Sequence, residues 1–254
     1  MKISPPLERV VILVKALPQP SKKYGETVCC AGVTADRRWK RLFPVRFRRL
    51  KGDNSFSRWD WVSFTYGRPK SDRRVESCHV HEESIAIEGR LKESERVRLL
   101  TPMLLGSAKA AAQKGQSLAL IRPRNTRFLW KLKTAEEISE EREVFRLAAR
   151  QPDMLDDEEL AELEPTPYKF SFRFDDEDGA HHYHNGDWEA HAMFWRQSQE
   201  ISTVDALQWM NHVFNEDYPK KGMVFALGNM AKRPQTWQLL GVIRLDETTQ
   251  DELF

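Results

Sequence analysis

The chain has 254 residues, of which 40% are apolar and 31% are charged, and its formal net charge is +2. This composition is globular and excludes a largely disordered chain. The length allows one large domain or two small ones. Three cysteines are too few for a disulfide framework, so we expect free thiols and a cytoplasmic location. No apolar stretch is long enough for a signal peptide core or a membrane span, so we expect no membrane partner.

Five short segments in the first half are rich in β-branched and aromatic residues and are bounded by turn-forming residues. They predict strands at 9–17, 26–34, 39–47, 59–67 and 117–123. Strands at this spacing are typical of a small barrel or sandwich. A helix is expected at 101–115, where Thr101 can cap and Gly115 can end an Ala-rich segment.

An acidic segment follows, and its pattern predicts two short helices. Thr134 and Glu137 form a capping box at the start of the first helix. Pro152 separates that helix from a second one, which begins near residue 153. We therefore interpret residues 134–165 as an acidic helical connector.

The last part mixes strands and helices. A hairpin is predicted at 168–184, a helix capped by Asp187, a second helix capped by Ser202, and two final strands. The sequence thus predicts an α+β fold in four segments. These are a basic β-rich domain at 1–133, the connector at 134–165, a smaller α+β domain at 166–245 and an acidic tail at 246–254.

The small net charge hides a strong asymmetry along the chain. Residues 1–133 hold 29 Lys and Arg against 12 Asp and Glu, a net charge of +17. Residues 134–254 hold 11 against 26, a net charge of −15. Such an asymmetry indicates a half that binds a polyanion. The alternative is that the two oppositely charged halves dock on each other.

The densest basic stretch, residues 37–51, interleaves eight Lys and Arg with aromatic residues. Guanidinium groups neutralise phosphates, and exposed aromatic rings stack on unpaired bases, so we expect a nucleic-acid partner, with DNA favoured over RNA. The aromatic residues can equally belong to the core, since alternation along a strand separates core from surface. The candidate nucleic-acid-binding residues are Arg37, Arg38, Trp39, Lys40, Arg41, Arg46, Arg48, Arg49, Lys51, Arg68, Lys70, Arg73, Arg74, Arg122, Arg124 and Arg127.

The segment HHYHNGDWEAH, residues 181–191, holds four of the seven histidines. Its expected order of hairpin, loop and helix resembles that of ββα-metal nucleases, although the HNH signature is not matched. A metal here would ionise a bound water, and a nearby base would accept the proton. The alternative is a solvated hairpin and an ordinary capped helix. The candidate metal ligands are His182, His184, Asp187 and His191, and the candidate catalytic residues are His184, Asp187, Glu189 and His191.

The chain ends in QDELF, which resembles the bacterial sliding-clamp-binding peptide, Gln-x-x-Leu-Phe. Gln250, Leu253 and Phe254 match the three defined positions of that motif. The resemblance implies that Leu253 and Phe254 fill a pocket of the clamp while Gln250 forms hydrogen bonds beside it. The alternative is that the two apolar residues fold back onto the protein's own core.

Together these features favour a DNA-binding protein of replication, repair or genome defence, which contacts the phosphate backbone through a basic β face and is recruited by a sliding clamp. One alternative is a metal-dependent nuclease that uses the histidine cluster, and only this alternative requires a cofactor, a divalent metal. A second alternative is a protein–protein adaptor in which the acidic segment mimics DNA. The sequence leaves open whether the protein is an enzyme.

Overall fold

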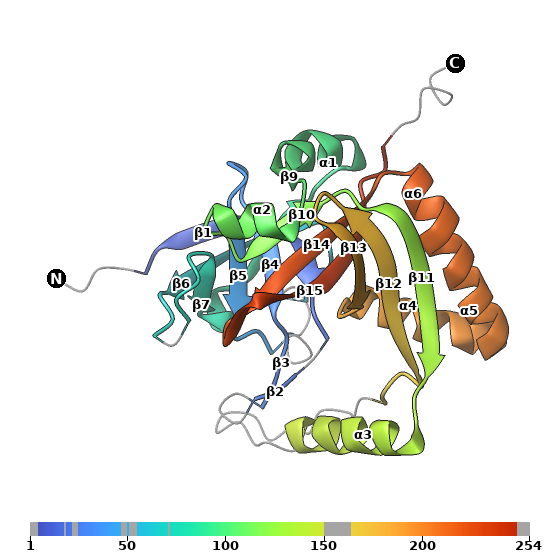
Figure 1. The fold of residues 1–254 in the computed structure, drawn as a ribbon. Helices are drawn as coiled ribbons and strands as arrows, with labels where there is room; N and C mark the ends of the chain where they lie inside the picture. The colour runs from blue at the N-terminus through green and yellow to red at the C-terminus, as the bar shows by residue number, and fades with distance from the viewer. Residues whose placement is uncertain are drawn as a thin grey trace. The chain divides into compact units, whose positions relative to one another are not determined.

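The computed structural model has the expected α+β fold (Figure 1). It describes residues 5–17, 19–21, 25–46, 50, 55–70, 72–149 and 164–247. The chain forms two compact units. Unit 1 contains Met1–Arg90 and Leu132–Tyr168, and unit 2 contains Leu91–Lys131 and Lys169–Phe254. In the described ranges, no helix has the length and apolar character needed to cross a membrane.

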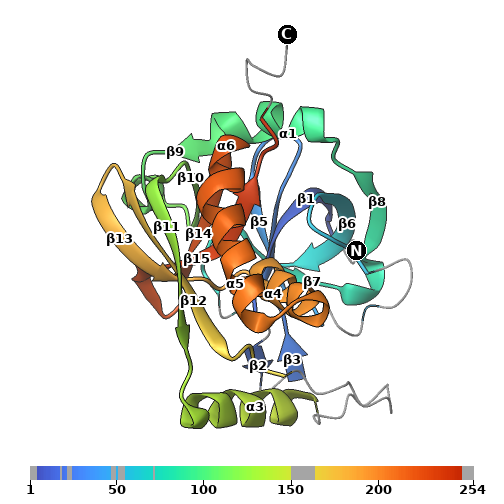
Figure 2. The same cartoon turned by 90° about the vertical axis from the view of Figure 1, so that its right-hand side faces the viewer.

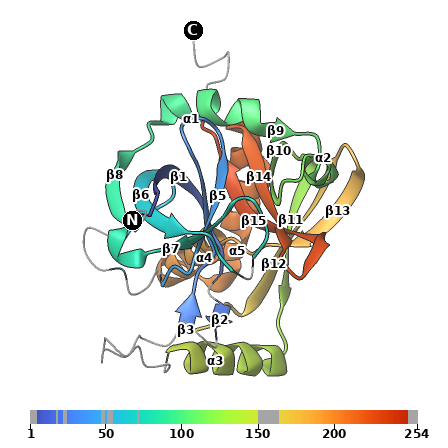
Figure 3. The same cartoon turned by 90° about the vertical axis from the view of Figure 1, so that its left-hand side faces the viewer.

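Unit 1 is built on a closed five-stranded barrel (Figure 3), which confirms the barrel prediction. The first strand pairs with two others and so closes the sheet, and an additional strand, β8 (Ala86–Arg90), pairs with β6. β5 and β7 run parallel, and the other pairs of the barrel are antiparallel. In barrel order the strands are β1 (Leu7–Lys15), β4 (Cys30–Val33), β5 (Trp39–Phe43), β7 (Ser77–Val80) and β6 (Asp60–Gly67).

The barrel closes around alternate apolar side chains of its strands. Val10 and Ile12 of β1, Leu42 of β5 and Phe64 of β6 are fully buried in one cluster, as expected for a small barrel filled by side chains. β4 approaches β1 closely at Gly32. A Cβ atom there would lie 2.6 Å from the carbonyl oxygen of Val11, so this pairing requires glycine.

The acidic helix belongs to unit 1 and contacts a small hairpin (Figure 1). The helix is α3 (Ala135–Ala149), and the hairpin consists of β2 (Gln19–Ser21) and β3 (Gly25–Thr27). The predicted capping box is confirmed. The Thr134 amide donates to Glu137 Oε2 at 3.1 Å, and the Glu137 amide donates to Thr134 Oγ1 at 3.2 Å. The second predicted helix of the connector lies outside the described residues.

Unit 2 contains two sheets and a set of helices (Figure 2). The four-stranded sheet has the order β15 (Arg233–Arg244), β14 (Met223–Met230), β10 (Leu118–Ile121) and β9 (Leu104–Leu105). The three-stranded sheet has the order β11 (Arg124–Leu132), β12 (Tyr168–Asp176) and β13 (Gly179–His184). The helical elements, with the short 3-10 turn η4 and the π turn η5, are α1 (Glu93–Leu100), η4 (Thr101–Met103), α2 (Ala108–Gln113), α4 (Trp188–Glu200), α5 (Thr203–His212), η5 (Val213–Asp217) and α6 (Tyr218–Lys220).

A cluster of buried phenylalanines holds the three-stranded sheet against the helices. The ring of Phe128 on β11 lies 5.5 Å from that of Phe170 and 5.3 Å from that of Phe172, both on β12. It also lies 5.0 Å from the ring of Phe214, in the π turn that follows α5. Aromatic pairs at these separations add stabilisation beyond the area they bury. The core face of the sheet is therefore the face that carries Phe128.

Two predictions about this part of the chain were wrong. The helix expected at 101–115 forms only as α2, which Ser107 caps by accepting from the Ala110 amide at 3.2 Å. The residues before it form a 3-10 turn and the short strand β9. The domain boundaries also differ. Residues 91–131 belong to unit 2, although they were expected in the first domain, because β10 pairs with β14.

The closed barrel makes a first prediction. Leu42→Ala should lower the free energy of unfolding by about 2–5 kcal/mol, since Leu42 is fully buried and the substitution leaves a cavity. Leu7→Ala is the matched control. Leu7 is 71% exposed, so the change should stay within about 0.5 kcal/mol. Urea unfolding, monitored by tryptophan fluorescence, measures the free energy of unfolding of both variants. An equal loss of this free energy in the two variants would contradict the described core.

Candidate nucleic-acid interface

Four of the predicted basic residues of unit 1 are paired with carboxylates. Lys40 Nζ lies 2.9 Å from Glu8 Oε2, and Arg46 Nε lies 2.6 Å from Glu82 Oε2. Arg38 and Arg74 each pair with an aspartate two positions earlier, at 2.6 Å. A cation in such a pair is partly neutralised already, so its attraction for a phosphate is reduced.

The Arg74 pair is the best organised of these. The Arg74 side chain donates to both carboxylate oxygens of Asp72, at 2.6 to 3.1 Å, and the Ser77 hydroxyl donates to the same carboxylate at 2.7 Å. Burial alone would raise the pKa of Asp72, but the hydrogen bonds from Arg74 and Ser77 outweigh it and lower the pKa to about 2. Asp72 therefore stays charged and continues to hold Arg74.

Two further predicted residues are buried in the described structure. Trp39 is 7% exposed and Arg41 is 8% exposed. Burial, reinforced by the nearby Arg74 charge, lowers the pKa of Arg41 to about 10. The prediction that these two side chains contact nucleic acid is therefore corrected, because packing around β5 covers both.

The remaining predicted residues fall into three groups. Arg122 pairs with Glu247, and Arg124 donates to the carbonyl oxygen of Asp176 at 3.0 Å. Arg48, Arg49 and Lys51 lie outside the described residues. Of the predicted residues that the structure describes, those with an exposed cation and no carboxylate partner are Arg37, Arg68, Lys70, Arg73 and Arg127.

The two folded units do not carry opposite net charges, although the two halves of the sequence do. Unit 1 holds 23 Lys and Arg against 22 Asp and Glu, and unit 2 holds 17 against 16, so each has a net charge of +1. The reason is that the acidic segment joins the basic barrel in unit 1. Binding of a polyanion must therefore depend on where unpaired cations gather, and not on the net charge of either unit.

The histidine cluster is divided between an exposed strand and a buried helix start. His182 and His184 are exposed on β13, and His182 Nε2 lies 3.0 Å from Ser171 Oγ. His181 points to the other face, where its Nε2 lies 2.8 Å from Asp176 Oδ1. This division follows from the alternation of side chains along a strand.

Asp187 and His191 have structural partners at the start of α4. Asp187 is 1% exposed, and its carboxylate accepts from the Glu189 amide at 3.1 Å and from the Val242 amide at 2.9 Å. His191 is buried, with Nε2 at 3.4 Å from the Asn185 carbonyl oxygen and its ring 5.0 Å from that of Phe170. Asp187 thus caps the helix and ties it to β15.

The metal-site prediction is corrected accordingly. Among the described residues, no three His, Cys, Asp or Glu side chains gather closely enough to hold a metal ion. His182 and His184 lie on an exposed strand, whereas Asp187 and His191 are engaged in the cap and the core. The predicted catalytic set of His184, Asp187, Glu189 and His191 is divided in the same way.

These contacts predict a structural role for Asp187. Asp187→Ala should lower the free energy of unfolding by about 2–4 kcal/mol, because the helix loses its cap and the buried Val242 amide loses its acceptor. Glu200→Ala, at an exposed position of the same helix, should change it by less than about 0.5 kcal/mol. Thermal unfolding with and without Zn²⁺ or Mn²⁺ provides the check. A metal-dependent rise in Tm that Asp187→Ala abolishes would contradict this role.

The face of the three-stranded sheet opposite the phenylalanine cluster carries unpaired cations. Phe128, Phe170 and Phe172 face the core, so the alternate residues face outward. In Figure 1 no described helix of unit 2 lies in front of these strands. We call this surface the outer sheet face, and its residues include Arg127, Leu129 and Lys131 of β11, Ser171, Arg173 and Asp175 of β12, and His182 and His184 of β13.

The cations of the outer sheet face have no carboxylate partner in the part of the chain that is described. Arg127, Lys131 and Arg173 are all exposed. The nearest carboxylate along β12, that of Asp175, accepts a hydrogen bond from Asn125 Nδ2 at 2.6 Å. In unit 1, by comparison, four of the predicted cations are paired with carboxylates, whereas Arg37, Arg68, Lys70 and Arg73 have no carboxylate partner among the described residues.

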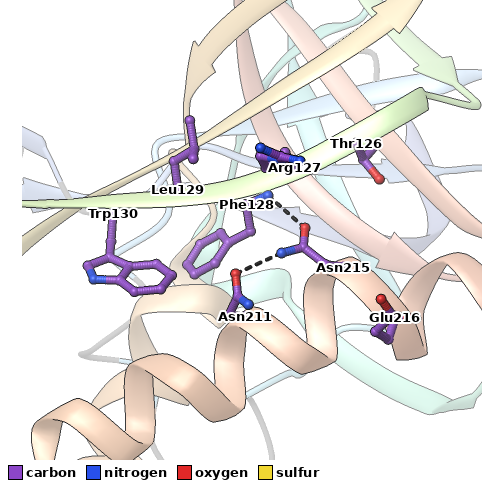
Figure 4. Close-up of a pocket in the computed structure, with 8 residues that line it drawn as sticks. All are labelled: Thr126, Arg127, Phe128, Leu129, Trp130, Asn211, Asn215 and Glu216. Atoms are coloured by element: carbon purple, nitrogen blue, oxygen red, sulfur yellow. Dashed lines mark hydrogen bonds between the residues drawn. The ribbon is translucent and has the colours of Figure 1, made fainter.

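A cavity of about 630 Å³ lies under the free edge of β11 (Figure 4). Five consecutive residues of β11, 126–130, form one wall, and Asn211, Asn215 and Glu216 form the other. The Phe128 amide donates to Asn215 Oδ1 at 2.8 Å, so the edge of the strand is tied to the π turn. Trp130 is 38% exposed at one end of this wall.

Sequence reasoning missed most of these residues. A strand was predicted at 117–123, and Arg124 and Arg127 were expected to bind nucleic acid, but the long strand that begins at Arg124 was not predicted. The alternation in YKFSFRF could have placed Arg173 opposite the phenylalanines. Asn211 and Asn215 are one helical turn apart, which was also a visible signal. Their meeting with β11, by contrast, has no signal in the sequence.

Family models match nearly the whole chain. Residues 101–254 match the model described as "Domain of unknown function (DUF8757)". The chain belongs to the DUF8757 family. Residues 6–104 match a second model, "Domain of unknown function (DUF8758)". The border between the two matches lies close to the start of unit 2 at Leu91, and the DUF8757 part contains the outer sheet face and the cavity. No curated protein matches the chain.

Proposed function

We propose that the protein binds single-stranded nucleic acid through the outer sheet face. The observation that carries this proposal is the set of three exposed cations without carboxylate partners, Arg127, Lys131 and Arg173, on one face of one sheet. Cations that contact phosphates release condensed counterions, and unpaired cations do so without first breaking an ion pair. The two exposed histidines, His182 and His184, add hydrogen-bonding groups to the same face.

The shape of this surface favours a single strand over a duplex. The common motifs that read a duplex place a helix or a two-stranded ribbon in its major groove. In the described part of unit 2, no helix projects from the outer sheet face (Figure 2). A single strand, in contrast, can follow the sheet and stack a base on the exposed ring of Trp130.

The proposal predicts a salt-dependent loss of binding when two of these cations are removed. Arg127→Ala combined with Arg173→Ala should weaken binding to a labelled 20-nucleotide strand about tenfold at low salt. The slope of log K against log salt should fall by about 1.4, because two phosphate contacts are lost. Fluorescence anisotropy measures the affinity and its salt dependence. Single-stranded DNA, single-stranded RNA and duplex DNA are compared as ligands.

The matched control removes two charges elsewhere in unit 2. Lys92→Ala combined with Lys114→Ala changes the exposed residues just before α1 and just after α2, which have no described ion pair. This control should bind as the wild type does. Equal weakening by both double variants, or no binding of any strand at low salt, would overturn the proposed function. The DNA and RNA arms test the expected preference for DNA.

Recruitment by a sliding clamp is a separate proposal that rests on the QDELF sequence alone. Gln250, Leu253 and Phe254 lie outside the described residues. Leu253→Ala combined with Phe254→Ala should weaken binding to an immobilised bacterial clamp at least about thirtyfold, since two anchors are removed. Thr248→Ala combined with Thr249→Ala is the control. Equal binding by both variants would show that this segment is not a clamp motif.

Action in replication, repair or genome defence stays a prediction that follows from DNA and clamp binding. The adaptor alternative also stays a prediction, and the described part of the acidic segment supports it weakly. Two carboxylates of α3 are already paired, since Lys133 Nζ lies 2.6 Å from Glu141 Oε2 and Arg146 pairs with Glu143 in the same helix. A mimic of DNA would present such carboxylates to its partner.

A further inference from the structure

The side-chain amide of Asn211 lines the cavity beside β11, and the contacts around it determine that its free atom is the hydrogen-bond donor Nδ2. The Phe128 amide can only donate, so Asn215 turns Oδ1 toward it. Asn215 Nδ2 then donates to Asn211 Oδ1 at 2.7 Å. This chain of hydrogen bonds leaves Asn211 Nδ2 as a donor with no partner among the described residues (Figure 4).

A carboxylate lines the same cavity because the helix widens there. Residues Val213–Asp217 form a π turn, in which the Tyr218 amide donates to the Val213 carbonyl oxygen five positions earlier. A wider turn brings Glu216, five positions after Asn211, closer to the face that holds Asn211 and Asn215. Among the described residues Glu216 pairs with the exposed Lys220, at 3.4 Å, and Glu216 is itself exposed, so its carboxylate is accessible.

An aromatic ring, that of Trp130, lines the same cavity at the end away from Glu216 (Figure 4). Trp130 points from β11 to the same side as Phe128, and the two ring centroids are 5.9 Å apart (Figure 4). One part of the indole is thus supported by the core, while 38% of the residue stays exposed. A supported and partly exposed indole is a platform on which a nucleobase can stack.

β11 itself connects this cavity to the outer sheet face. Arg127 and Leu129 point outward from the strand, whereas Phe128 and Trp130 point toward the helix (Figure 4). A nucleic-acid strand held by Arg127 and Lys131 would therefore need to turn only one base over the free edge of β11 to reach the cavity. The volume of about 630 Å³ is ample for one base.

We propose that this cavity receives one unstacked base of the bound strand and that it favours guanine. This inference rests on the proposed function. The guanine edge presents one acceptor, O6, beside two donors, N1–H and N2–H. Asn211 Nδ2 supplies a donor for O6, and the Glu216 carboxylate accepts from the two N–H groups. The other three bases each offer the carboxylate a single donor group on this edge: the amino group of cytosine or adenine, or the N3–H of thymine, which lies between two acceptors. Only guanine presents two adjacent donors to the carboxylate beside an acceptor for Asn211.

Base substitution within one oligonucleotide tests the inference. The ligands are labelled 15-nucleotide thymidine strands in which the central base is guanine, adenine, cytosine or thymine. The guanine strand should bind the wild-type protein about five- to tenfold more tightly than the other three. Asn211→Ala and Glu216→Gln should each abolish this preference, while the salt dependence of binding stays that of the wild type.

Matched controls separate base recognition from folding. Gln208→Ala removes an amide from an exposed position of α5 and should retain the guanine preference. Thermal unfolding checks that Asn211→Ala and Glu216→Gln are folded. Trp130→Ala should weaken binding of all four strands, because stacking does not depend on the base.

The failures of the two proposals are distinguishable. If all four strands bind equally and with salt dependence, the base pocket is overturned and the proposed function stands. If another base is preferred and Asn211→Ala abolishes that preference, the assignment to guanine is overturned. If no strand binds at low salt, both the proposed function and the base pocket are overturned.

Discussion

The packing of Phe128 is the interaction on which the candidate site depends. Its ring contacts Phe170 and Phe172 on the neighbouring strand and Phe214 in the π turn. Its amide donates to Asn215. One residue thus decides which side chains of β11 face outward and how close the strand lies to the helix. The outer sheet face and the cavity are both consequences of this placement, because neighbouring residues on a strand point to opposite sides.

The pairing of charges decides which basic residues can act on a polyanion. In the barrel, Lys40, Arg46 and Arg74 are matched by carboxylates within 3 Å. On the outer sheet face, Arg173 and Lys131 have no such partner in the described chain. An exposed ion pair contributes little to stability, but it must be broken or shared before the cation can neutralise a phosphate. A count of basic residues along the sequence therefore overestimates the binding surface of unit 1.

The histidine cluster illustrates how local structure separates residues that are adjacent in sequence. His182 and His184 share one face of β13, whereas His181 faces Asp176 on the other. The Asp187 carboxylate accepts hydrogen bonds from two backbone amides, those of Glu189 and Val242. Val242 is on β15, more than fifty residues later in the chain. A metal site requires side chains to converge on one point, and here they satisfy the helix start and the core instead.

Much of the secondary structure followed from the sequence, because its causes are local. Segments rich in β-branched and aromatic residues predicted four of the five barrel strands, whereas β7 was missed and the fifth predicted strand is β10 of unit 2. The capping residues Thr134, Asp187 and Ser202 marked three helix starts correctly. The α+β class was also predicted correctly. Residues 101–107 were misassigned because an Ala-rich run suggests a longer helix than tertiary packing allows.

The sequence by itself determined the strand pattern, the helix caps and the uneven distribution of charge along the chain. Only the tertiary structure decided that the acidic segment belongs to the same unit as the barrel, so that the opposite charges of the two nearly cancel within unit 1. It also decided that β11 lies beside the turn carrying Asn215, almost ninety residues later. Such contacts arise from the packing of distant apolar residues, and no local pattern encodes which distant partner a polar side chain will meet.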